Sequence, residues 1–301
     1  MTPPYLHPGD TIGITCPAGF VSYENRVVPS IALLEKWGFK VKVGKTVGSS
    51  YHYFSGKDEE RLEDLQDMLD DTSIKAILMG RGGYGMSRII DAIDFTVFKK
   101  HPKWICGFSD ITVLHNHIQA LYQLPTLHSP MCGAFTSLTE TAPHILQFKE
   151  LITGKKSTIQ FPISEHNKSG KANAVITGGN LVMLAHLTGS VSEVDTRHKI
   201  LFIEDVGEHY YNIDRLMINL KRAGKLDHLA ALLVGSFTDM QDTERPFGHS
   251  IEEIVLDKVK DYDYPVAFNF PCGHQEENYT LKLGATYQLD VRTDGSCLTT
   301  L

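Results

Sequence analysis

The stretch from Ile74 to Ile93, IKAILMGRGGYGMSRIIDAI, decides the fold class. Its first six residues, Ile74–Met79, form an apolar run that predicts a strand. Glycines follow from Gly80 to Gly85, and the residues from Met86 to Ile93 then have a helical pattern. A strand that passes through a glycine turn into a helix is typical of βαβ units, whose strands pair in parallel.

The same alternation of strand and helix continues on both sides of this stretch. Apolar or alternating runs predict three further strands, at Thr11–Cys16, Phe39–Val43 and Trp104–Gly107. Helical spacing of apolar residues predicts three longer helices, at Val27–Trp37, Lys57–Asp71 and Ile111–Tyr122. We therefore expect an α/β domain with a mainly parallel sheet.

A polar stretch rich in Lys, Ser and Gly, near Thr153 to Ala172, interrupts this pattern. We place the boundary there: an N-terminal domain over 1–155, a linker over 156–173 and a smaller C-terminal domain over 174–301. The second part contains predicted strands and helices in mixed order, so we expect it to be α+β. Its predicted elements are Leu181–Leu187, Lys199–Ile203, Ile213–Arg222, Leu229–Val234 and short strands near Val266 and over Leu281–Val291.

Composition excludes several classes of function. The 301 residues are 42% hydrophobic, so a core can form, and the net charge of -7 without a long basic run argues against nucleic acid. No window reaches the roughly 20 apolar residues of a membrane span, and no signal peptide is visible. We expect a soluble, cytoplasmic protein.

Cysteine and histidine spacing predicts neither disulfides nor a metal site. The five cysteines include no CxxC pair, so we expect most of them to be small buried residues. His115 and His117 would face different sides of a helix, with His128 further along, which is poor metal geometry. The glycines at 80–85 match neither a Walker A loop nor a dinucleotide fingerprint, so no cofactor is expected.

Two segments of the N-terminal half could carry chemistry. The glycines of Gly80–Gly85 either let the backbone approach a ligand or form a tight turn. In Gly107-Phe-Ser-Asp110 an apolar strand runs into a helix, the context of a nucleophile elbow, although Ile111 stands where that motif has glycine. Ser109 is a candidate nucleophile, or else Ser109 or Asp110 only caps the next helix. Cys106 is a rival nucleophile, but it lies within the strand pattern.

The C-terminal half offers an acid and a base. Glu204 is the first polar residue after a predicted strand, whereas Asp205 and Glu208 could belong to a solvated loop. His274 follows a glycine after the apolar run that ends at Phe270. With Ser109 these residues supply a hydroxyl, a carboxylate and an imidazole at strand ends, so they could converge in a cleft between the domains.

Five ordered motifs resemble the LD-carboxypeptidase family of serine peptidases. They span nearly the whole chain, and five motifs in the right order are far more specific than any one of them. They are Gly-Arg-Gly-Gly-Tyr-Gly at 80–85, Gly-Phe-Ser-Asp at 107–110, Thr-Gly-Gly-Asn at 177–180, Ile-Glu-Asp-Val-Gly-Glu at 203–208 with Ile-Asp-Arg at 213–215, and Gly-His at 273–274.

The resemblance implies roles for individual residues. The nucleophile would be Ser109, the orienting acid Glu204 and the base His274. The oxyanion hole would use the N–H of Asp110 and an N–H of the glycine loop, placed at Gly82 with Gly83 as the alternative. By chemistry alone, Arg81 is a candidate for binding the terminal carboxylate of the substrate, or it is a solvated or ion-paired arginine.

The resemblance also implies a fold and a substrate. It implies a flavodoxin-like N-terminal domain, an active site between the domains, a homodimer, and a murein tetrapeptide that loses its terminal D-Ala. A sister branch cleaves the acyl-sulfamoyl adenylate of microcin C; its members carry an additional aromatic-bearing loop, and no Trp occurs within Thr153 to Ala172. A non-catalytic two-lobed binding protein and a glutaminase that uses Cys106 stay as further alternatives.

Overall fold

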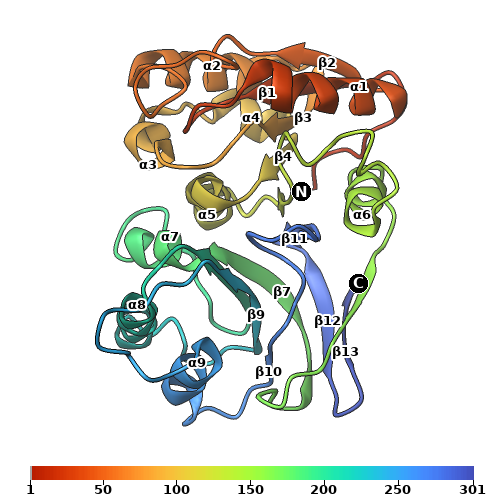
Figure 1. Ribbon diagram of the computed structural model, residues 1–301. Coiled ribbons are helices and arrows are strands. Elements are labelled where there is room, and N and C mark those ends of the chain that lie inside the picture. Colours follow the sequence, from red (N-terminus) through yellow and green to blue (C-terminus); the bar gives the residue numbers. More distant parts are fainter. Residues whose placement is uncertain (1) are drawn as a thin grey trace. The chain divides into compact units, whose positions relative to one another are not determined.

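The computed structural model describes residues 2–301, which divide into two compact units. Unit 1 extends to Lys155 and includes the returning segment Tyr279–Lys282. Unit 2 consists of Lys156–Asn278 and Leu283–Leu301. Each unit is built around its own sheet (Figure 1).

The sheet of unit 1 has the strand order β11-β5-β4-β3-β1-β2. The pairs β1/β2, β1/β3, β3/β4 and β4/β5 are all parallel. The order β2-β1-β3-β4-β5 is that of flavodoxin-like folds, so the expected fold class is confirmed. The strands are β1 (Thr11–Thr15), β2 (Lys40–Val43), β3 (Ile74–Met79), β4 (Trp104–Gly107), β5 (Thr126–His128) and β11 (Leu281–Leu283).

Unit 1 also contains helices, and all of them except the last connect two of its parallel strands. They are α1 (Val28–Lys36), α2 (Asp58–Asp70), α3 (Met86–Ile89), α4 (Thr96–Lys100), α5 (Thr112–Tyr122) and α6 (Pro143–Ile152). A core cluster joins Ile12 and Leu78 of the central strands with Trp104 of β4 and Phe148 of α6. Burial of these apolar side chains holds the strand ends of the sheet in fixed positions.

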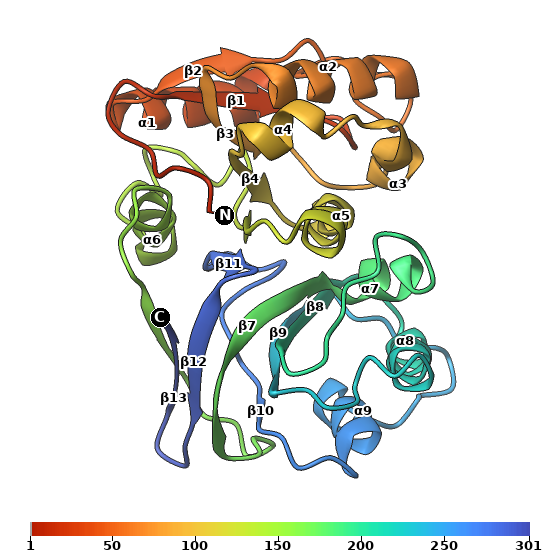
Figure 2. The ribbon, with the colours of Figure 1, turned by 180° about the vertical axis from the view of Figure 1, so that it is seen from behind.

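The sheet of unit 2 is mixed, with the order β10-β9-β8-β7-β12-β13-β6. The strands β7 to β10 pair in parallel, whereas β7/β12, β12/β13 and β13/β6 are antiparallel. Figure 2 shows β12 and β13 side by side, next to β7. The bounds are β6 (Thr158–Phe161), β7 (Gly170–Asn180), β8 (Ile200–Val206), β9 (Ala231–Thr238), β10 (Val266–Ala267), β12 (Thr286–Val291) and β13 (Ser296–Thr300).

Three helices accompany the parallel part of the unit 2 sheet. In both ribbon views α7 (Leu181–Leu187), α8 (Tyr210–Arg222) and α9 (Ile251–Val259) lie together, away from β12 and β13 (Figures 1 and 2). Sequence patterns predicted α7 with its observed bounds but not α9, which begins with a capping box of Ser250 and Glu253. No helix within residues 2–301 is long and apolar enough to cross a bilayer.

The segment 156–173, expected to be a linker, contains ordered strand. Thr158–Phe161 forms β6, which pairs with β13 near the end of the chain, and β7 begins at Gly170. Ile159 and Phe161 are buried between exposed neighbours, which is the alternation of a half-buried strand. The polar composition of the segment gave no sign of a strand. Its pairing partner, β13, is more than a hundred residues away, so no neighbouring segment indicated the pairing either.

Candidate active site

Ser109 stands at a strained turn between β4 and the helices that follow. Its backbone φ is +65°, in the left-handed region that residues other than glycine rarely adopt. Residues Ser109–Ile111 form one 3-10 turn, and α5 begins at Thr112. A serine at a sharp, strained junction of strand and helix is the arrangement of a nucleophile elbow.

Helix capping, the alternative role for Ser109 and Asp110, is not what the structure shows. The residue at the N-cap of α5 is Ile111, and the 3-10 turn before it is preceded by Phe108; neither cap has a side-chain hydrogen bond. Asp110 Oδ2 accepts a hydrogen bond from the backbone N–H of Met86, 2.8 Å away. Its carboxylate therefore ties the nucleophile turn to the end of the glycine loop.

The glycine loop approaches Ser109 closely at Gly82. A Cβ atom at Gly82 would lie 2.8 Å from the Cβ and 3.1 Å from the Oγ of Ser109, distances at which no larger residue fits. The carbonyl of Gly82 accepts a 2.9 Å hydrogen bond from the N–H of Gly19, which fixes the next peptide unit. Glycine at position 82 therefore allows the loop backbone to pack closely against Ser109.

Burial perturbs the carboxyl group of Asp110. The residue is only 2% exposed, and desolvation raises its pKa from 3.8 to about 6. The hydrogen bond from Met86 favours the charged form and opposes this rise. The carboxylate of Asp110 thus remains a hydrogen-bond acceptor for Met86 at neutral pH. The backbone N–H of Asp110 is part of the turn Ser109–Ile111.

In unit 2 the structure brings His274 and Glu204 together. The Nδ1 atom of His274 lies 2.7 Å from Oε2 of Glu204, which is fully buried. Because a carboxylate only accepts, Nδ1 carries the proton, and a neutral imidazole is then unprotonated at Nε2. In catalytic triads the base is an imidazole held in this tautomer by a buried orienting acid, so the geometry of this pair suits those two roles.

Two features of unit 2 hold the His274 loop against Glu204. A Cβ atom at Gly273 would lie 2.8 Å from Oε2 of Glu204, and the φ of Gly273 is +127°, so only glycine suits this position. The N–H of Gly273 donates to Asn278 Oδ1 at 3.0 Å, and the hydroxyl of Thr238 donates to the carbonyl of His274 at 2.8 Å. The imidazole is therefore presented from a fixed backbone.

Strand β8 extends further than its apolar residues predicted. It continues to Val206, so Glu204 and Asp205 lie within the strand rather than after it. Asp205 is not in a solvated loop: its carboxylate accepts from the Asn180 side chain at 3.0 Å and from the N–H of Val182 at 2.9 Å. Burial raises the pKa of Asp205 to about 6. These bonds satisfy a polar side chain inside the sheet and allow the strand to continue.

The other predicted residues have distinct settings. Arg81 is exposed, and its guanidinium donates to the carbonyl of Phe20 at 2.9 Å. Cys106 is fully buried, and burial raises the pKa of its thiol, which disfavours a thiolate nucleophile. Within residues 2–301 no group of three or more His, Cys, Asp and Glu side chains is placed to hold a metal ion.

Sequence reasoning missed two buried charged residues of α2: Arg61, which binds the glycine loop at the Gly85 carbonyl, and Asp64, which accepts from the hydroxyl of Thr15. Both are buried, at 0% and 2% exposure. A signal was present, because Arg61 precedes Leu65 by four residues and Asp64 precedes Met68 by four, which places both on the apolar stripe of the helix.

With this geometry described, comparison with known proteins identifies the family. Residues 12–129 match the LD-carboxypeptidase N-terminal domain, and residues 173–289 match the LD-carboxypeptidase C-terminal domain. The chain belongs to the LD-carboxypeptidase family. The resemblance drawn from the five motifs is thereby confirmed. The first matched segment falls in unit 1, and the second falls in unit 2 except for Tyr279–Lys282.

Several LD-carboxypeptidase relatives resemble the chain over most of its length. A Bacillus subtilis (strain 168) protein named "Probable murein peptide carboxypeptidase" is 36% identical over 286 residues, covering 94% of this chain and 89% of the relative. The solved structure of muramoyltetrapeptide carboxypeptidase from Oxalobacter formigenes has a TM-score of 0.85 and 26% identity, covering 96% of this chain and 98% of that one. The microcin C7 self-immunity protein MccF, solved in complex with aspartyl sulfamoyl adenosine, has a TM-score of 0.86 and 25% identity, covering 99% and 98%.

Proposed function

We propose that this LD-carboxypeptidase is a serine enzyme that hydrolyses the L,D amide bond and releases the terminal D-Ala of murein tetrapeptides. The observation that carries the proposal is the strained Ser109 turn packed against Gly82. A structural serine needs neither a left-handed backbone nor a glycine at contact distance. The names of the Bacillus subtilis and Oxalobacter formigenes proteins support murein peptides as the substrate class.

In the first chemical step Ser109 becomes acylated. Its Oγ attacks the carbonyl carbon before the terminal D-Ala, while Nε2 of His274 takes the hydroxyl proton. Glu204 keeps the proton on Nδ1 and stabilises the imidazolium that forms. Collapse of the tetrahedral intermediate breaks the C–N bond, and His274 returns the proton to the departing amine of D-Ala.

Backbone N–H groups stabilise the oxyanion of that intermediate. We assign one to Asp110 and the other to the glycine loop, at Gly82 or Gly83. Each such donor contributes about 3 kcal/mol to transition-state stabilisation. Gly82 contacts Ser109 directly, and its carbonyl is already bound by Gly19, which keeps this part of the loop in one orientation.

Water completes the cycle by hydrolysing the acyl-enzyme. His274 removes a proton from the water, whose oxygen attacks the ester carbonyl, and the proton then passes to the departing Oγ of Ser109. The products are D-Ala and a tripeptide that ends in a free carboxylate. No cofactor or metal takes part in this scheme.

We propose Arg81 as the partner of the substrate's terminal carboxylate. It is exposed, and it lies one residue before Gly82, which contacts Ser109. A guanidinium can bind a carboxylate through two parallel hydrogen bonds. Its bond to the Phe20 carbonyl uses one donor and keeps the side chain beside the glycine loop.

We further propose that the enzyme is a cytoplasmic homodimer, as the resemblance implies for the family. Light scattering of the purified protein, which gives the molar mass in solution, distinguishes a dimer of about twice 33.6 kDa from a monomer. Fractionation of cells tests the compartment.

A fluorophosphonate probe and a murein tetrapeptide together test the proposed function. We expect the probe to label Ser109 of the wild-type protein and the tetrapeptide to lose one D-Ala. Ser109→Ala should remain folded, take up no label and release no D-Ala. A two-lobed binding protein would leave the tetrapeptide intact and the probe unreacted. A MccF-like peptidase would be labelled but would cleave an aminoacyl sulfamoyl nucleoside in preference to the tetrapeptide.

A further inference from the structure

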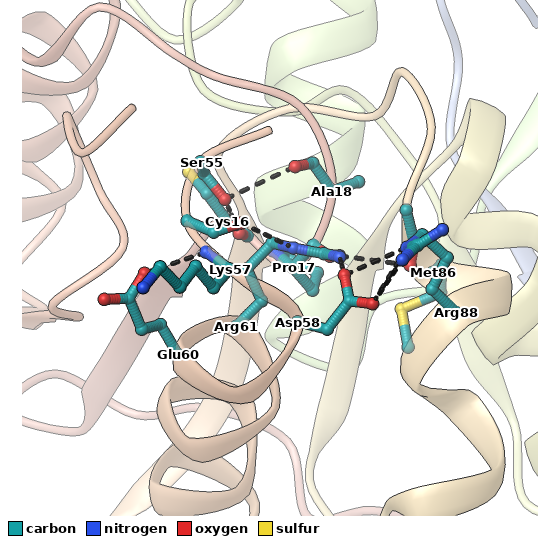
Figure 3. Close-up of polar contacts among 12 residues, drawn as sticks. Cys16, Pro17, Ala18, Ser55, Lys57, Asp58, Glu60, Arg61, Met86 and Arg88 are labelled. Carbon is teal, nitrogen blue, oxygen red and sulfur yellow. Dashed lines mark hydrogen bonds and ion pairs between the residues drawn. The ribbon is translucent and has the colours of Figure 1, made fainter. Parts of the chain in front are cut away.

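Arg61 is a fully buried arginine whose guanidinium lies beneath the glycine loop. The side chain rises from the first turns of α2 and has no exposed surface (Figure 3). Its guanidinium also lies over the ring of Phe54, 4.9 Å from the centroid. Burying an arginine costs desolvation free energy unless its N–H groups are hydrogen-bonded. The partners of those N–H groups therefore indicate the role of the side chain.

The partners of Arg61 are three backbone carbonyls from three separate segments. Its Nε donates to the carbonyl of Gly56 at 3.1 Å, and its Nη1 donates to the carbonyls of Pro17 and Gly85, the latter at 3.0 Å. Gly85 closes the glycine loop, and Pro17 follows the end of β1. One planar group therefore fixes three turns relative to one another.

Asp58 balances the charge of Arg61. Its carboxylate forms an ion pair with Nη2 of Arg61 and a second one with Arg88 (Figure 3). Hydrogen bonds from Arg88, and then from Arg61, hold the pKa of Asp58 below its ordinary value. The guanidinium consequently has a counterion that also pairs with Arg88, three residues after Gly85.

The peptide unit between Gly85 and Met86 is held at both of its polar atoms. Arg61 binds its carbonyl oxygen, and Asp110 Oδ2 accepts from its N–H at 2.8 Å. The other end of the loop is held by Gly19, which donates to Gly82 at 2.9 Å and lies two residues after Pro17. The segment from Gly82 to Gly85 is thus held at one end by Arg61 itself. At the other end it is held by Gly19, in the turn whose Pro17 carbonyl Arg61 also binds.

From these contacts we propose that Arg61 is a positioning residue for catalysis. It holds the glycine loop so that a loop N–H lies at the distance from Ser109 that oxyanion stabilisation requires. The inference rests on the proposed function. It assigns Arg61 no contact with substrate: its effect passes through the Pro17 and Gly85 carbonyls to the N–H of Gly82 or Gly83. A displacement of about 1 Å in such a donor is enough to lower a rate about 10²-fold.

Gly85 is matched to this role. A Cβ atom there would lie 2.6 Å from Nη1 of Arg61, and the φ of Gly85 is +149°. Glycine at this position is therefore required by the guanidinium as well as by the turn. A lysine in place of Arg61 could not replace the fork of donors, because an ammonium group is a compact point charge.

Kinetics of two Arg61 variants test the proposal. For Arg61→Lys we expect kcat on the tetrapeptide to fall at least about 10-fold, and for Arg61→Met about 10²-fold, with KM changed less than about threefold in both. The split between kcat and KM separates a misplaced oxyanion donor from lost substrate binding. Lysine should restore part of the kcat lost in the methionine variant.

Lys103→Met is the matched control. Lys103 is also a buried cation, 1% exposed, that donates to two backbone carbonyls, Met68 at 2.9 Å and Asp71 at 2.6 Å. These carbonyls are at the opposite end of α2 from Arg61. We expect the control to lower the thermal unfolding midpoint as the Arg61 variants do, but to leave kcat within about twofold of wild type.

The outcomes separate this inference from the proposed function. Failure of wild type to release D-Ala, or retained release in Ser109→Ala, would overturn the proposed function whatever Arg61 does. With those two results as expected, a folded Arg61→Lys or Arg61→Met with wild-type kcat overturns the positioning role. So does an equal loss of kcat in Lys103→Met. If neither Arg61 variant folds, Gly85→Ala decides, and its retention of wild-type kcat would also overturn the role.

Discussion

The Nδ1 atom of His274 lies 2.7 Å from Oε2 of Glu204, a carboxylate with no exposed surface. Its other oxygen, Oε1, is also buried and accepts no hydrogen bond from residues 2–301. The acid therefore directs its single strong interaction at the imidazole, which fixes the tautomer in which Nε2 is the acceptor. This pair, 70 residues apart in the chain, is the part of the candidate site that we propose as the base and its orienting acid.

Glu204→Gln tests the orienting role of this acid. The amide would donate or accept at Nδ1 and so stabilise the wrong imidazole tautomer. We expect kcat to fall about 10³- to 10⁴-fold, with KM and the thermal unfolding midpoint close to wild type. Steady-state hydrolysis of the tetrapeptide measures kcat and KM. A decrease in kcat of less than 10-fold would remove Glu204 from the triad.

A double-mutant comparison tests whether Ser109 and His274 act together. In a triad the losses do not add, so Ser109→Ala, His274→Ala and the double variant should all have about the same residual rate. The comparison uses D-Ala release by the three purified proteins at one pH. Losses that multiply in the double variant would show that the two residues contribute independently.

Gly82→Ala tests the close approach of the glycine loop. The added methyl group would lie 2.8 Å from the Cβ of Ser109, so either the loop or the nucleophile must move. We expect kcat to fall about 10²-fold or more in a protein that remains folded. Gly248→Ala is the control, because a Cβ there meets no described atom within 4 Å. Its φ of +85° strains the substitution locally, so stability should decrease while kcat stays unchanged.

Asp110→Asn tests the buried carboxyl of the nucleophile turn through the pH dependence of stability. The pKa of Asp110 is raised to about 6 in the folded protein from 3.8, so the folded state binds the proton more tightly. Its stabilising contribution is complete below pH 3.8 and is lost as the pH rises through 6.

The asparagine variant lacks this titration. Its free energy of unfolding relative to wild type should therefore increase between pH 4 and pH 7, by at most about 3 kcal/mol. Urea unfolding of both proteins at the two pH values measures the change. A difference that is constant with pH, or that decreases toward pH 7, would contradict the raised pKa.

Local pattern predicted elements that are marked by a continuous apolar run. The strands Ile74–Met79 and Trp104–Gly107 and the helix Leu181–Leu187 have the bounds expected from their apolar runs. Strand β6 was missed, because its four residues gain stability only by pairing with β13 at the far end of the chain. The predicted strand Lys199–Ile203 ends three residues before β8 does. The strand continues because hydrogen bonds from Asn180 and Val182 satisfy Asp205 inside it.

The candidate site divides in the same way. Residue types at strand ends indicated Ser109, Glu204 and His274 as possible reactants, but which of them meet depends on tertiary structure and came from the family resemblance. Arg61 could not be recognised from its helix alone, because its role depends on carbonyls at Pro17, Gly56 and Gly85. Those partners belong to three turns that come together only in the folded sheet.

The bond that is cut is the most direct test of the whole account. If the substrate's terminal carboxylate is bound at a fixed distance from Ser109, a pentapeptide ending in D-Ala-D-Ala would place it one residue, about 3.5 Å, too far along. The carboxylate's proposed partner, Arg81, would then be left unpaired, as it would be for an amidated tetrapeptide. The measurement is mass spectrometry of digests of the tetrapeptide, the pentapeptide and the amidated tetrapeptide by the wild-type enzyme. The account predicts loss of a single D-Ala from the tetrapeptide and little change in the other two, whereas rapid trimming of pentapeptide to tetrapeptide, or equal cleavage of the amidated form, would contradict it.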